Sequence, residues 1–324
     1  MRVVITGAAG FIGSRMSEMV LEEAERLGYD EVVLFDALTY SGRLENLASV
    51  LGDPRVTFIR GSINDELVAD EVLAGAQAVL HLAAESHVDR SIAGARLFYE
   101  TNVLGTQQLL ESARRSGVER FVHVSTDEVY GSIDQGAWRE DHLLAPNSPY
   151  SSSKAGSDLA ALAYQSTYGL NVTVTRCSNN YGPRQFPEKL IPLFVTNLFD
   201  GQTVPLYGDG LNVRDWLFVD DHCRGILRVL EAGRPGEIYN IGGGTELTNV
   251  EITRLLLELC GADESMIEPV DDRLGHDRRY SVDWTKINEE LGYRPVVDFK
   301  EGLARTVKWY RENEAWWRPL KERQ

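Results

Sequence analysis

Side chains that donate, accept or relay protons are concentrated in two short segments of this sequence. Residues 125–128, Ser-Thr-Asp-Glu, directly follow an apolar run, and Tyr150 and Lys154 lie further along the chain. Hydroxyl, carboxyl, phenol and ammonium groups together can move protons during a reaction. The apolar run before them is typical of a strand in a nucleotide-binding fold. The combination predicts a redox enzyme that also transfers protons.

Tyr150 and Lys154 are spaced to act as a pair. On a helix predicted over residues 149–168, this spacing places them on one face with Cβ atoms about 5 to 6 Å apart. A free tyrosine has a pKa of about 10, and lowering it by about three units takes roughly 4 kcal/mol. A neighbouring ammonium in a partly dry cleft can supply that order of energy. Alone, the spacing is a common helical pattern; behind a dinucleotide site it predicts a catalytic pair.

Asp127 and Glu128 are adjacent carboxyl groups at the expected C-terminal end of a strand. A solvated loop is the ordinary setting for such a pair, but α/β proteins place their sites at the C-terminal ends of strands, which favours catalysis. Burial and like-charge proximity can separate two neighbouring pKa values. One carboxyl could then act as an acid while the other acts as a base.

The sequence TGAAGFIG at residues 6–13 lies between the first predicted strand and the first predicted helix. Gly7, Gly10 and Gly13 permit a tight turn and close approach of backbone amides to phosphate groups, and the helix N-terminus favours negative charge. The glycine spacing differs by one residue from the common dinucleotide fingerprint, but the strand-turn-helix setting is the required one. Asp36 ends the second predicted strand, where a carboxylate accepts ribose hydroxyls and repels a 2′-phosphate. NAD is therefore the expected cofactor rather than NADP.

Short β-branched runs alternate with amphipathic stretches through the first half of the chain. Strands are expected over residues 3–6, 31–36, 56–60, 78–81, 120–125 and 171–176, and the longer helices over residues 11–27, 97–116 and 149–168. Near-continuous apolar strands separated by helices indicate a parallel sheet covered on both faces. The expected fold is a doubly wound α/β (Rossmann) domain over residues 1–176.

After residue 176, glycine-rich breaks interrupt this rhythm, and helical patterns return over residues 190–200, 250–260 and 300–313. Residues 177–324 are expected to form a smaller, loop-rich substrate domain. Segments around residues 216–242 are expected to return to the first sheet.

Composition limits the partners. The formal net charge is -16 with a pI near 4.9, which disfavours nucleic acid but not a small nucleotide. No apolar run approaches a membrane span, and the N-terminus does not read as a signal peptide. Three widely separated cysteines fit a reducing compartment and predict a cytoplasmic protein. Histidines and cysteines have no ligand spacing, so no metal site is expected.

Longer motifs extend through nearly the whole chain. They are residues 7–13, 83–89 (AAESHVD), 125–130, Tyr150 with Lys154, 179–183 (NNYGP) and 214–216 (RDW). On these motifs the chain resembles the extended short-chain dehydrogenase/reductase family and, within it, the dTDP-glucose 4,6-dehydratases. Thr126, Asp127 and Glu128 carry the distinction, because sugar-nucleotide epimerases of the same family usually have small or neutral residues there.

The resemblance implies a lyase that converts dTDP-glucose to dTDP-4-keto-6-deoxyglucose and water with bound NAD. Tyr150 would take the 4-hydroxyl proton as hydride leaves C4, with Thr126 hydrogen-bonded to the same oxygen and Lys154 beside the phenol. The C4 ketone makes the C5 proton acidic, so Glu128 would act as base at C5 and Asp127 as acid at the 6-hydroxyl, before the hydride returns to C6. The nearest alternative is another nucleotide-sugar dehydratase or a 4-epimerase of the same fold. A catalytically silent NAD-binding protein is disfavoured, because it has no use for this set of proton-transferring residues.

The resemblance also implies the binding residues and the assembly. Cofactor-binding residues are expected to be Gly7, Gly10, Phe11, Ile12, Gly13, Asp36, Thr39, Ser62, Ile63, Ala83, Ala84, Asn102, Ser125, Tyr150, Lys154 and Asn180. Substrate-binding residues are expected to be Ser86, Thr126, Asp127, Glu128, Asn179, Lys189, Leu190, Pro205, Tyr207, Arg214, Asn249, Arg273, His276 and Tyr280. Ala8 and Ser62 depart from the family pattern, which commonly has glycine and aspartate there. A homodimer that pairs the helices over residues 97–116 and 149–168 is expected by analogy.

Overall fold

The computed structural model describes residues 1–321. Its first half contains β1 (Arg2–Thr6), α1 (Phe11–Glu22), α2 (Ala24–Leu27), β2 (Glu31–Asp36), η1 (Leu44–Leu47), β3 (Val56–Arg60), α3 (Glu66–Leu73), β4 (Ala76–His81), α4 (Val88–Ala93), α5 (Ala95–Phe98), η2 (Tyr99–Gly105), α6 (Thr106–Ser116), β5 (Arg120–Thr126), η3 (Asp127–Tyr130), α7 (Pro149–Tyr168) and β6 (Val172–Cys177). Its second half contains β7 (Asn179–Tyr181), α8 (Leu190–Phe199), β8 (Val204–Tyr207), β9 (Val213–Phe218), α9 (Val219–Ala232), β10 (Ile238–Ile241), β11 (Glu246–Thr248), α10 (Asn249–Cys260), η4 (Glu264–Met266), β12 (Ile267–Val270), α11 (Thr285–Leu291), α12 (Phe299–Glu312) and α13 (Glu314–Lys321).

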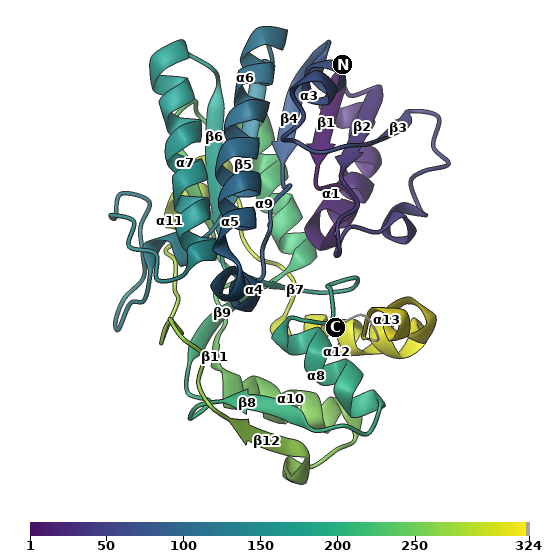
Figure 1. Cartoon of the computed structure of the whole chain (residues 1–324), viewed down its shortest axis with the longest axis vertical. Coiled ribbons are helices and arrows are strands. Elements are labelled where there is room, and N and C mark those ends of the chain that lie inside the picture. Colours follow the sequence, from purple (N-terminus) through teal and green to yellow (C-terminus); the bar gives the residue numbers. More distant parts are fainter. Residues whose placement is uncertain (322–324) are drawn as a thin grey trace.

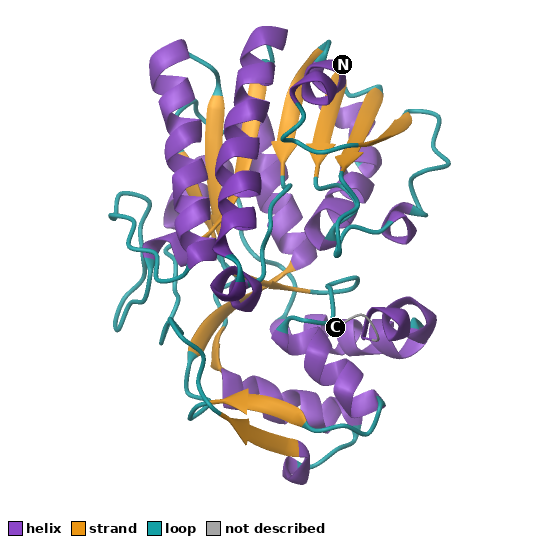
Figure 2. Cartoon of the chain, viewed as in Figure 1, coloured by secondary structure: helices purple, strands orange, loops and turns teal. Residues whose placement is uncertain are grey.

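A parallel sheet of seven strands forms the upper part of the molecule (Figures 1 and 2), in the order β10-β6-β5-β4-β1-β2-β3. The chain first runs outward from β1 to β2 and β3, and then crosses back to place β4 on the other side of β1. This reversal is the switch point at which open α/β sheets bind ligands beyond the C-terminal ends of their strands. The predicted doubly wound, Rossmann-like fold is confirmed.

Alternate residues of the strands face two separate apolar layers. Val3 and Ile5 of β1 pack with α1 and α9, whereas Val4 packs with α3, α6 and α7. Figure 1 accordingly shows α6 and α7 in front of the sheet and α1 and α9 behind it. Because both faces are covered, the strands are apolar along their length, as the sequence pattern indicated.

The second half of the chain contributes to both parts of the molecule. β10 pairs with β6 and becomes the edge of the large sheet, and α9 packs against the same sheet. Helix α11 packs against β10 and α9 in the same part of the molecule. The elements below surround a core shared by α8, α10, α12 and α13, with two small sheets, β11-β9-β7 and β12-β8. None of the helices within residues 1–321 is both long and apolar enough to cross a bilayer.

Two predicted helices are interrupted. The helix predicted over residues 11–27 breaks at Glu23 into α1 and α2. The helix predicted over residues 97–116 consists of α5, a π-helical stretch at η2, and α6. In η2 the buried side chain of Asn102 hydrogen-bonds the backbone of Glu85, which ties this wider turn to the loop after β4. Such π-helical turns occur often at functional sites.

Candidate active site

The end of β5 positions the two acidic residues. Thr126 is the last residue of the strand and caps η3, because its Oγ1 accepts a hydrogen bond from the backbone N–H of Glu128 at 3.2 Å. The same hydroxyl donates to Oδ1 of Asp127 at 3.2 Å. A threonine cap therefore turns the chain sharply at the C-terminal edge of the sheet, so both carboxyl groups start the next turn there.

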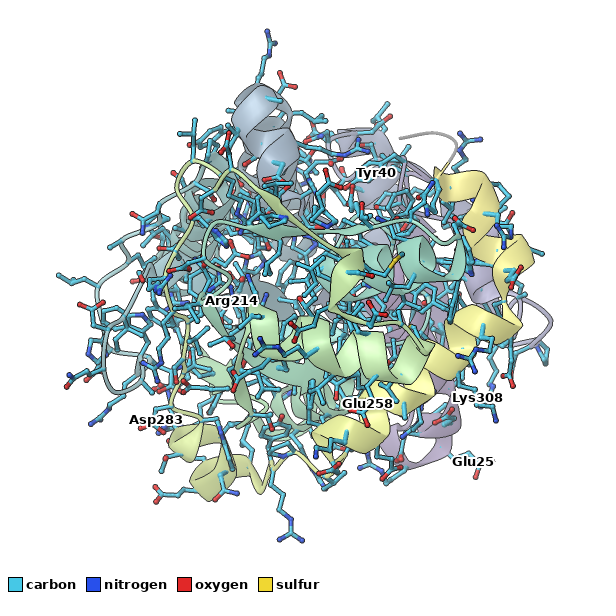
Figure 3. The ribbon with its side chains drawn as sticks, turned by 90° about the horizontal axis from the view of Figure 1, so that it is seen from below. Glu25, Tyr40, Arg214, Glu258, Asp283 and Lys308 are labelled. Atoms are coloured by element: carbon cyan, nitrogen blue, oxygen red, sulfur yellow. The ribbon has the colours of Figure 1, made fainter. Side chains whose placement is uncertain are left out.

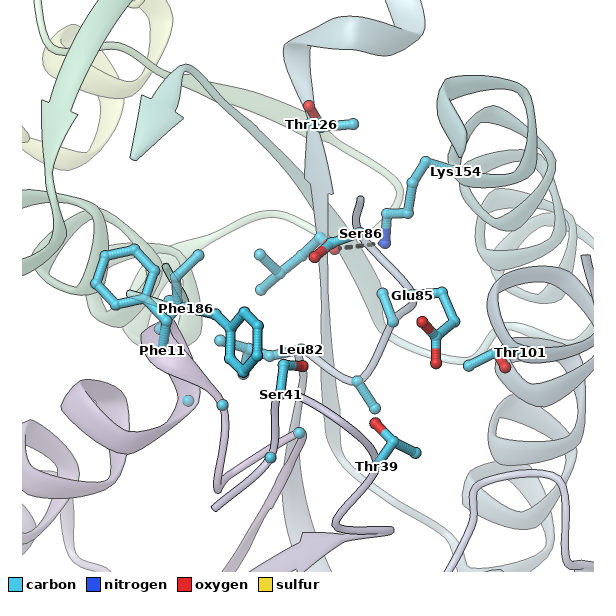
Figure 4. A pocket seen from close by; sticks show the side chains of 18 of the residues that line it. Phe11, Thr39, Ser41, Leu82, Glu85, Ser86, Thr101, Thr126, Lys154 and Phe186 are labelled. Carbon is cyan, nitrogen blue, oxygen red and sulfur yellow. Dashed lines mark hydrogen bonds between the residues drawn. The ribbon is translucent and has the colours of Figure 1, made fainter. Parts of the chain in front are cut away.

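Helix α7 supplies the tyrosine and the lysine. Ser148 caps its N-terminus in a capping box with Ser151, and Pro149 occupies the first turn, which favours helix initiation at this point. Lys154 is buried, and its Nζ donates to the carbonyl of Val124 at 2.8 Å. Figure 4 shows Lys154 reaching from its helix toward the strand that ends at Thr126.

One cavity of about 730 Å³ joins these groups to the glycine turn. The predicted cofactor residues that line it are Gly7, Gly10, Phe11, Ile12, Gly13, Asp36, Thr39, Ser62, Ile63, Ala83, Ala84, Ser125, Tyr150, Lys154 and Asn180. The predicted substrate residues that line it are Ser86, Thr126, Asp127, Glu128, Asn179 and Lys189. Figure 4 shows the cavity between the glycine turn, with Phe11, and the helix that carries Lys154. The structure thus brings most predicted cofactor residues and six predicted substrate residues into one cavity. Their binding roles remain predictions.

The glycine turn has the shape that a dinucleotide phosphate needs. Gly7 has a φ of +66°, and a Cβ there would lie 2.7 Å from the backbone nitrogen of Ala83 at the end of β4. A Cβ at Gly13 would lie 2.0 Å from the carbonyl oxygen of Gly7. Asp36 accepts hydrogen bonds from the backbone of Ala9 at 2.9 Å and Leu38 at 2.7 Å. These contacts fix both the turn and the carboxylate along one wall of the cavity.

Several buried polar atoms along this cavity lack a hydrogen-bond partner within residues 1–321. They are Ser125 Oγ, Asp127 Oδ2, Asn179 Oδ1 and Asn180 Oδ1. Buried polar groups in proteins are nearly always paired, so unpaired ones at a cavity wall indicate a polar ligand. Together with the glycine turn, these atoms fit a nucleotide cofactor and a hydroxyl-rich substrate.

The charges around Asp127 and Glu128 differ, although the residues are neighbours. Burial raises the pKa of Asp127 well above its ordinary value, and the charges of Glu128 and Asp215 raise it further. Burial also raises the pKa of Glu128, but Lys189, Arg273 and Arg214 oppose that rise. The arrangement therefore favours the shared proton on Asp127 over Glu128.

The pKa values of Tyr150 and Lys154 are shifted in opposite directions. Burial raises the pKa of Tyr150 well above its ordinary value, and the nearby Glu128 carboxylate adds to that rise. Burial lowers the pKa of Lys154 to about 8, with Asp158 and Cys177 acting in the opposite sense. The protein alone therefore holds Tyr150 as a phenol, and an additional positive charge is needed to make it a base.

Asn102 does not line the cavity. Its side chain accepts from the backbone N–H of Glu85 at 2.8 Å and donates to the Glu85 carbonyl at 3.0 Å and to Ser153 Oγ at 2.8 Å. It therefore ties α7 and η2 to the loop that carries Glu85, a residue of the cavity wall. Asn102, a predicted cofactor residue, therefore lies behind the residues that line the cavity and holds them by hydrogen bonds.

The remaining predicted substrate residues lie outside the lining of this cavity, in the second half of the chain. Arg214 stacks over the ring of Tyr280 at 4.4 Å, and its charge, like that of Arg273, acts on Glu128. His276 packs edge-on against Tyr207, with ring centroids 6.3 Å apart. Three further residues are Leu190 at the start of α8, Pro205 in β8 and Asn249 at the start of α10. Arg214, Arg273 and Tyr280 thus lie close enough to Glu128 for their charges to interact with its carboxyl group.

Sequence reasoning assigned no role to several lining residues. Residues 184–186 and 188, Tyr40, Thr101 and Cys177 belong to the wall. Tyr40 and Glu188 contact each other although 148 positions separate them. No motif marks either residue, and only a signal of long-range contact could have paired them. Within residues 1–321, no group of three potential metal ligands gathers.

Known proteins resemble this chain along nearly its whole length. A family described as GDP-mannose 4,6 dehydratase matches residues 4–306. A dTDP-glucose 4,6-dehydratase of Streptomyces antibioticus is 60% identical, over 100% of this chain and 96% of the relative. A dTDP-glucose 4,6-dehydratase of Actinoplanes sp. is 58% identical, over 98% of this chain and 100% of the relative.

Solved structures give the same grouping. DesIV, a dTDP-glucose 4,6-dehydratase from Streptomyces venezuelae solved with NAD and dTDP bound, has a TM-score of 0.98 and 62% identity, and the match covers 99% of this chain and 100% of that one. A UDP-glucose 4-epimerase from Thermus thermophilus in complex with NAD has a TM-score of 0.88 and 32% identity, covering 97% and 100%. The fold is therefore shared with epimerases, while identity is much higher with the dehydratases. The chain belongs to the extended short-chain dehydrogenase/reductase family and, within it, to the dTDP-glucose 4,6-dehydratases.

Proposed function

We propose that this protein is an NAD-dependent lyase that converts dTDP-glucose to dTDP-4-keto-6-deoxyglucose and water. The observation that carries the proposal is the carboxyl pair Asp127 and Glu128, with different charge environments, in one cavity with Tyr150, Lys154 and the glycine turn. The likeness to dTDP-glucose 4,6-dehydratases along the whole chain supports it. The lower identity to epimerases argues against the nearest alternative.

The chain's own residues have distinct tasks in this reaction. When bound, the NAD ring accepts a hydride from C4 of the sugar and later returns it to C6. Tyr150 receives the proton of the 4-hydroxyl, and Thr126 hydrogen-bonds the same oxygen. Glu128 then removes the C5 proton, which the C4 ketone has made acidic, and Asp127 protonates the departing 6-hydroxyl. Hydride return to C6 and return of the proton from Glu128 to C5 complete the product. The proton that Tyr150 received from the 4-hydroxyl offsets the one that Asp127 gave to the departing water.

Tyr150 depends on nearby positive charge for its task. Because the surrounding protein raises the pKa of the phenol, the ammonium of Lys154 and the positive charge of the oxidised cofactor must together favour the phenolate. The Tyr150 phenolate therefore forms only when the oxidised cofactor, which accepts the hydride, is bound. At the other end, Arg214 and Arg273 suit the diphosphate of the substrate, because guanidinium groups bind phosphate oxygens in a bidentate manner.

Isotope transfer tests the proposed reaction. With dTDP-glucose that carries deuterium at C4, the label is expected at C6 of the product, because the hydride leaves and returns within one active site. Mass spectrometry and NMR of the product measure its position. A product that keeps its 6-hydroxyl, or a label lost to solvent, would contradict the dehydratase assignment.

The pKa shifts predict a narrow pH range of activity. Lys154 must be protonated to stabilise the phenolate, so kcat/KM is expected to fall as pH rises through about 8. Glu128 must be ionised to act as a base, and its raised pKa moves the acid limb above the range usual for glutamate. Initial rates measured across the pH range give both limbs. A kcat/KM that continues to rise at alkaline pH would contradict the role of Lys154.

We further propose a homodimer that buries the outer face of α5, η2 and α7, in a reducing, cytoplasmic setting consistent with three free cysteines. Leu97, Leu104, Leu159 and Tyr168 are each at least half exposed on these helices. Figure 1 shows α5, α6 and α7 side by side on one outer face of the molecule. Large apolar side chains gathered on helices of one face mark a surface that another chain covers.

Charges on this face are expected to separate the subunits. The double variant Leu104→Glu/Leu159→Glu should weaken the dimer about a hundredfold or more, because each buried leucine contributes about 1.5 to 3 kcal/mol and a buried unpaired carboxylate costs still more. Light scattering coupled to size-exclusion chromatography measures the mass. Leu143→Glu is the control, since Leu143 is 88% exposed in the loop between η3 and α7 and belongs to none of these helices. A wild-type protein that is monomeric would contradict the proposal.

A further inference from the structure

Three segments that are distant in the sequence meet at the carboxylate of Glu188. Its Oε1 accepts a hydrogen bond from Tyr40 Oη at 2.8 Å, and its Oε2 accepts one from Arg90 Nε at 3.2 Å. The Glu188 side chain is only 8% exposed. We call Tyr40, Arg90 and Glu188 the clasp. None of the three has a role in the proton transfers described above.

Further contacts hold the clasp together. The Arg90 guanidinium lies over the Tyr40 ring, 3.8 Å from its centroid, and the edge of the same ring meets Phe186 at 5.3 Å. The backbone is tied as well, because Lys189 Nζ donates to the carbonyl of Ser86 at 2.7 Å. Tyr40 is therefore held by an anion, a cation and an aromatic ring at once. Such combinations fix a side chain more firmly than one hydrogen bond does.

The clasp joins loops that enclose the cofactor side of the cavity. Tyr40 and Glu188 line the same cavity as the glycine turn and Asp36. Each of the two loops contains a non-glycine residue with positive φ, Leu38 at 52° and Arg184 at 66°. Such conformations persist only where the surroundings hold them. The Leu38 amide is held by Asp36 Oδ1 at 2.7 Å, and the Arg184 guanidinium by Glu18 at 2.7 Å.

Within the clasp, Tyr40 lies apart from Arg214. In the view from below (Figure 3), Tyr40 and Arg214 are well separated. Helix α4 presents adjacent residues to the two sides, since Arg90 binds Glu188 while Asp89 lies 3.7 Å from Arg273. Helix α4 thus lies between the clasp and Arg273.

We propose that Tyr40, Arg90 and Glu188 are positioning residues that retain NAD through successive turnovers. This inference rests on the proposed function, in which the hydride returns to the same sugar and the cofactor has no need to leave. Release of NAD requires the loops at Tyr40 and Glu188 to part, and hence the hydrogen bonds and the cation–π contact to break. The clasp therefore acts on the rate of cofactor release and not on a proton transfer.

Exchange of isotopically labelled NAD measures the rate of cofactor release directly. Protein loaded with labelled NAD is mixed with excess unlabelled NAD, without substrate, and the retained label is followed by mass spectrometry. Glu188→Gln is expected to accelerate exchange about tenfold, because charge-assisted hydrogen bonds contribute about 1.5 to 3 kcal/mol each. Tyr40→Phe, which keeps the ring, is expected to accelerate it about threefold to tenfold. Glu264→Gln is the matched control, because Glu264 also pairs with an arginine, Arg254, at 2.8 Å but far along the chain from the cavity, and it should exchange like the wild type.

The double variant tests whether the two residues act through one bond. Tyr40→Phe/Glu188→Gln is expected to accelerate exchange by less than the product of the two single effects, because Tyr40→Phe removes the hydrogen bond that Glu188→Gln weakens. Activity that these variants lose on dilution is expected to return when NAD is added, which general misfolding would not allow. Unchanged exchange rates, fully additive effects, or activity that added NAD does not restore would each overturn the clasp. A wild type that binds no NAD would instead overturn the proposed function.

Discussion

Replacing Asp127 with asparagine is expected to stop the reaction after the sugar has been oxidised. Asparagine fills the same space but cannot donate an acidic proton to the departing 6-hydroxyl. General acid catalysis contributes about 10² to 10⁴ to a rate, so elimination should slow by that factor. Oxidation at C4 relies on Tyr150 and is expected to change much less. The reduced cofactor should accumulate, and its near-ultraviolet absorbance after rapid mixing with dTDP-glucose measures the amount.

The matched control for this variant is Asp141→Asn. Asp141 is 75% exposed in the loop before α7, so the same change there should leave both steps as in the wild type. The raised pKa of Asp127 carries the prediction, because only a carboxyl that keeps its proton at neutral pH can serve as the acid. Equal slowing of oxidation and elimination in Asp127→Asn would exclude this role.

Replacing Tyr150 with phenylalanine is expected to block the first step itself. The variant keeps the ring, which meets Phe98 edge-on at a centroid distance of 6.4 Å, but loses the oxygen that takes the 4-hydroxyl proton. Turnover should fall by about 10² to 10⁴ without accumulation of reduced cofactor. Stopped-flow absorbance and product analysis together measure this. Tyr150→Phe and Asp127→Asn should thus differ in whether reduced cofactor appears.

Tyr168→Phe provides the comparison on the same helix. Tyr168 ends α7 and is 56% exposed, so removal of its hydroxyl should not alter the rate. Reduced cofactor formed at the wild-type rate by Tyr150→Phe would show that another group accepts the 4-hydroxyl proton. Thr126 would then be the first residue to examine, because its hydroxyl lies in the same cavity.

Apolar and amphipathic patterns account for most of the fold prediction. The bounds predicted for β2, β3 and α7 are those observed, because a β-branched run and an amphipathic stretch are local properties of the chain. The order of strands and helices was sufficient to predict the parallel, doubly wound sheet. The π-helical turn at η2 was missed; it is accompanied by the contact between Asn102 and Glu85, which no local pattern records. The domain boundary near residue 176 stays a prediction.

The residues of the candidate site also divide into those that the sequence predicted and those that only the folded structure brings together. The glycine turn, Asp36, and Tyr150 with Lys154 were predictable, since each is a short motif on one element. The clasp was not, because Tyr40, Arg90 and Glu188 come from three segments that meet only after folding.

Asp127 and Glu128 show most clearly what the sequence determines and what the tertiary structure decides. Chain order alone places Asp127 beside Glu128 and predicts that their pKa values separate, while the assignment of acid and base came from the resemblance. In the fold, the charges of Lys189, Arg273 and Arg214 lower the pKa of Glu128. At Asp127 the charges of Glu128 and Asp215 raise the pKa, and Arg214 opposes them. Electrostatic energy depends on distance and burial, and distances between residues so far apart in the chain exist only once the sheet and the second half of the chain have packed together.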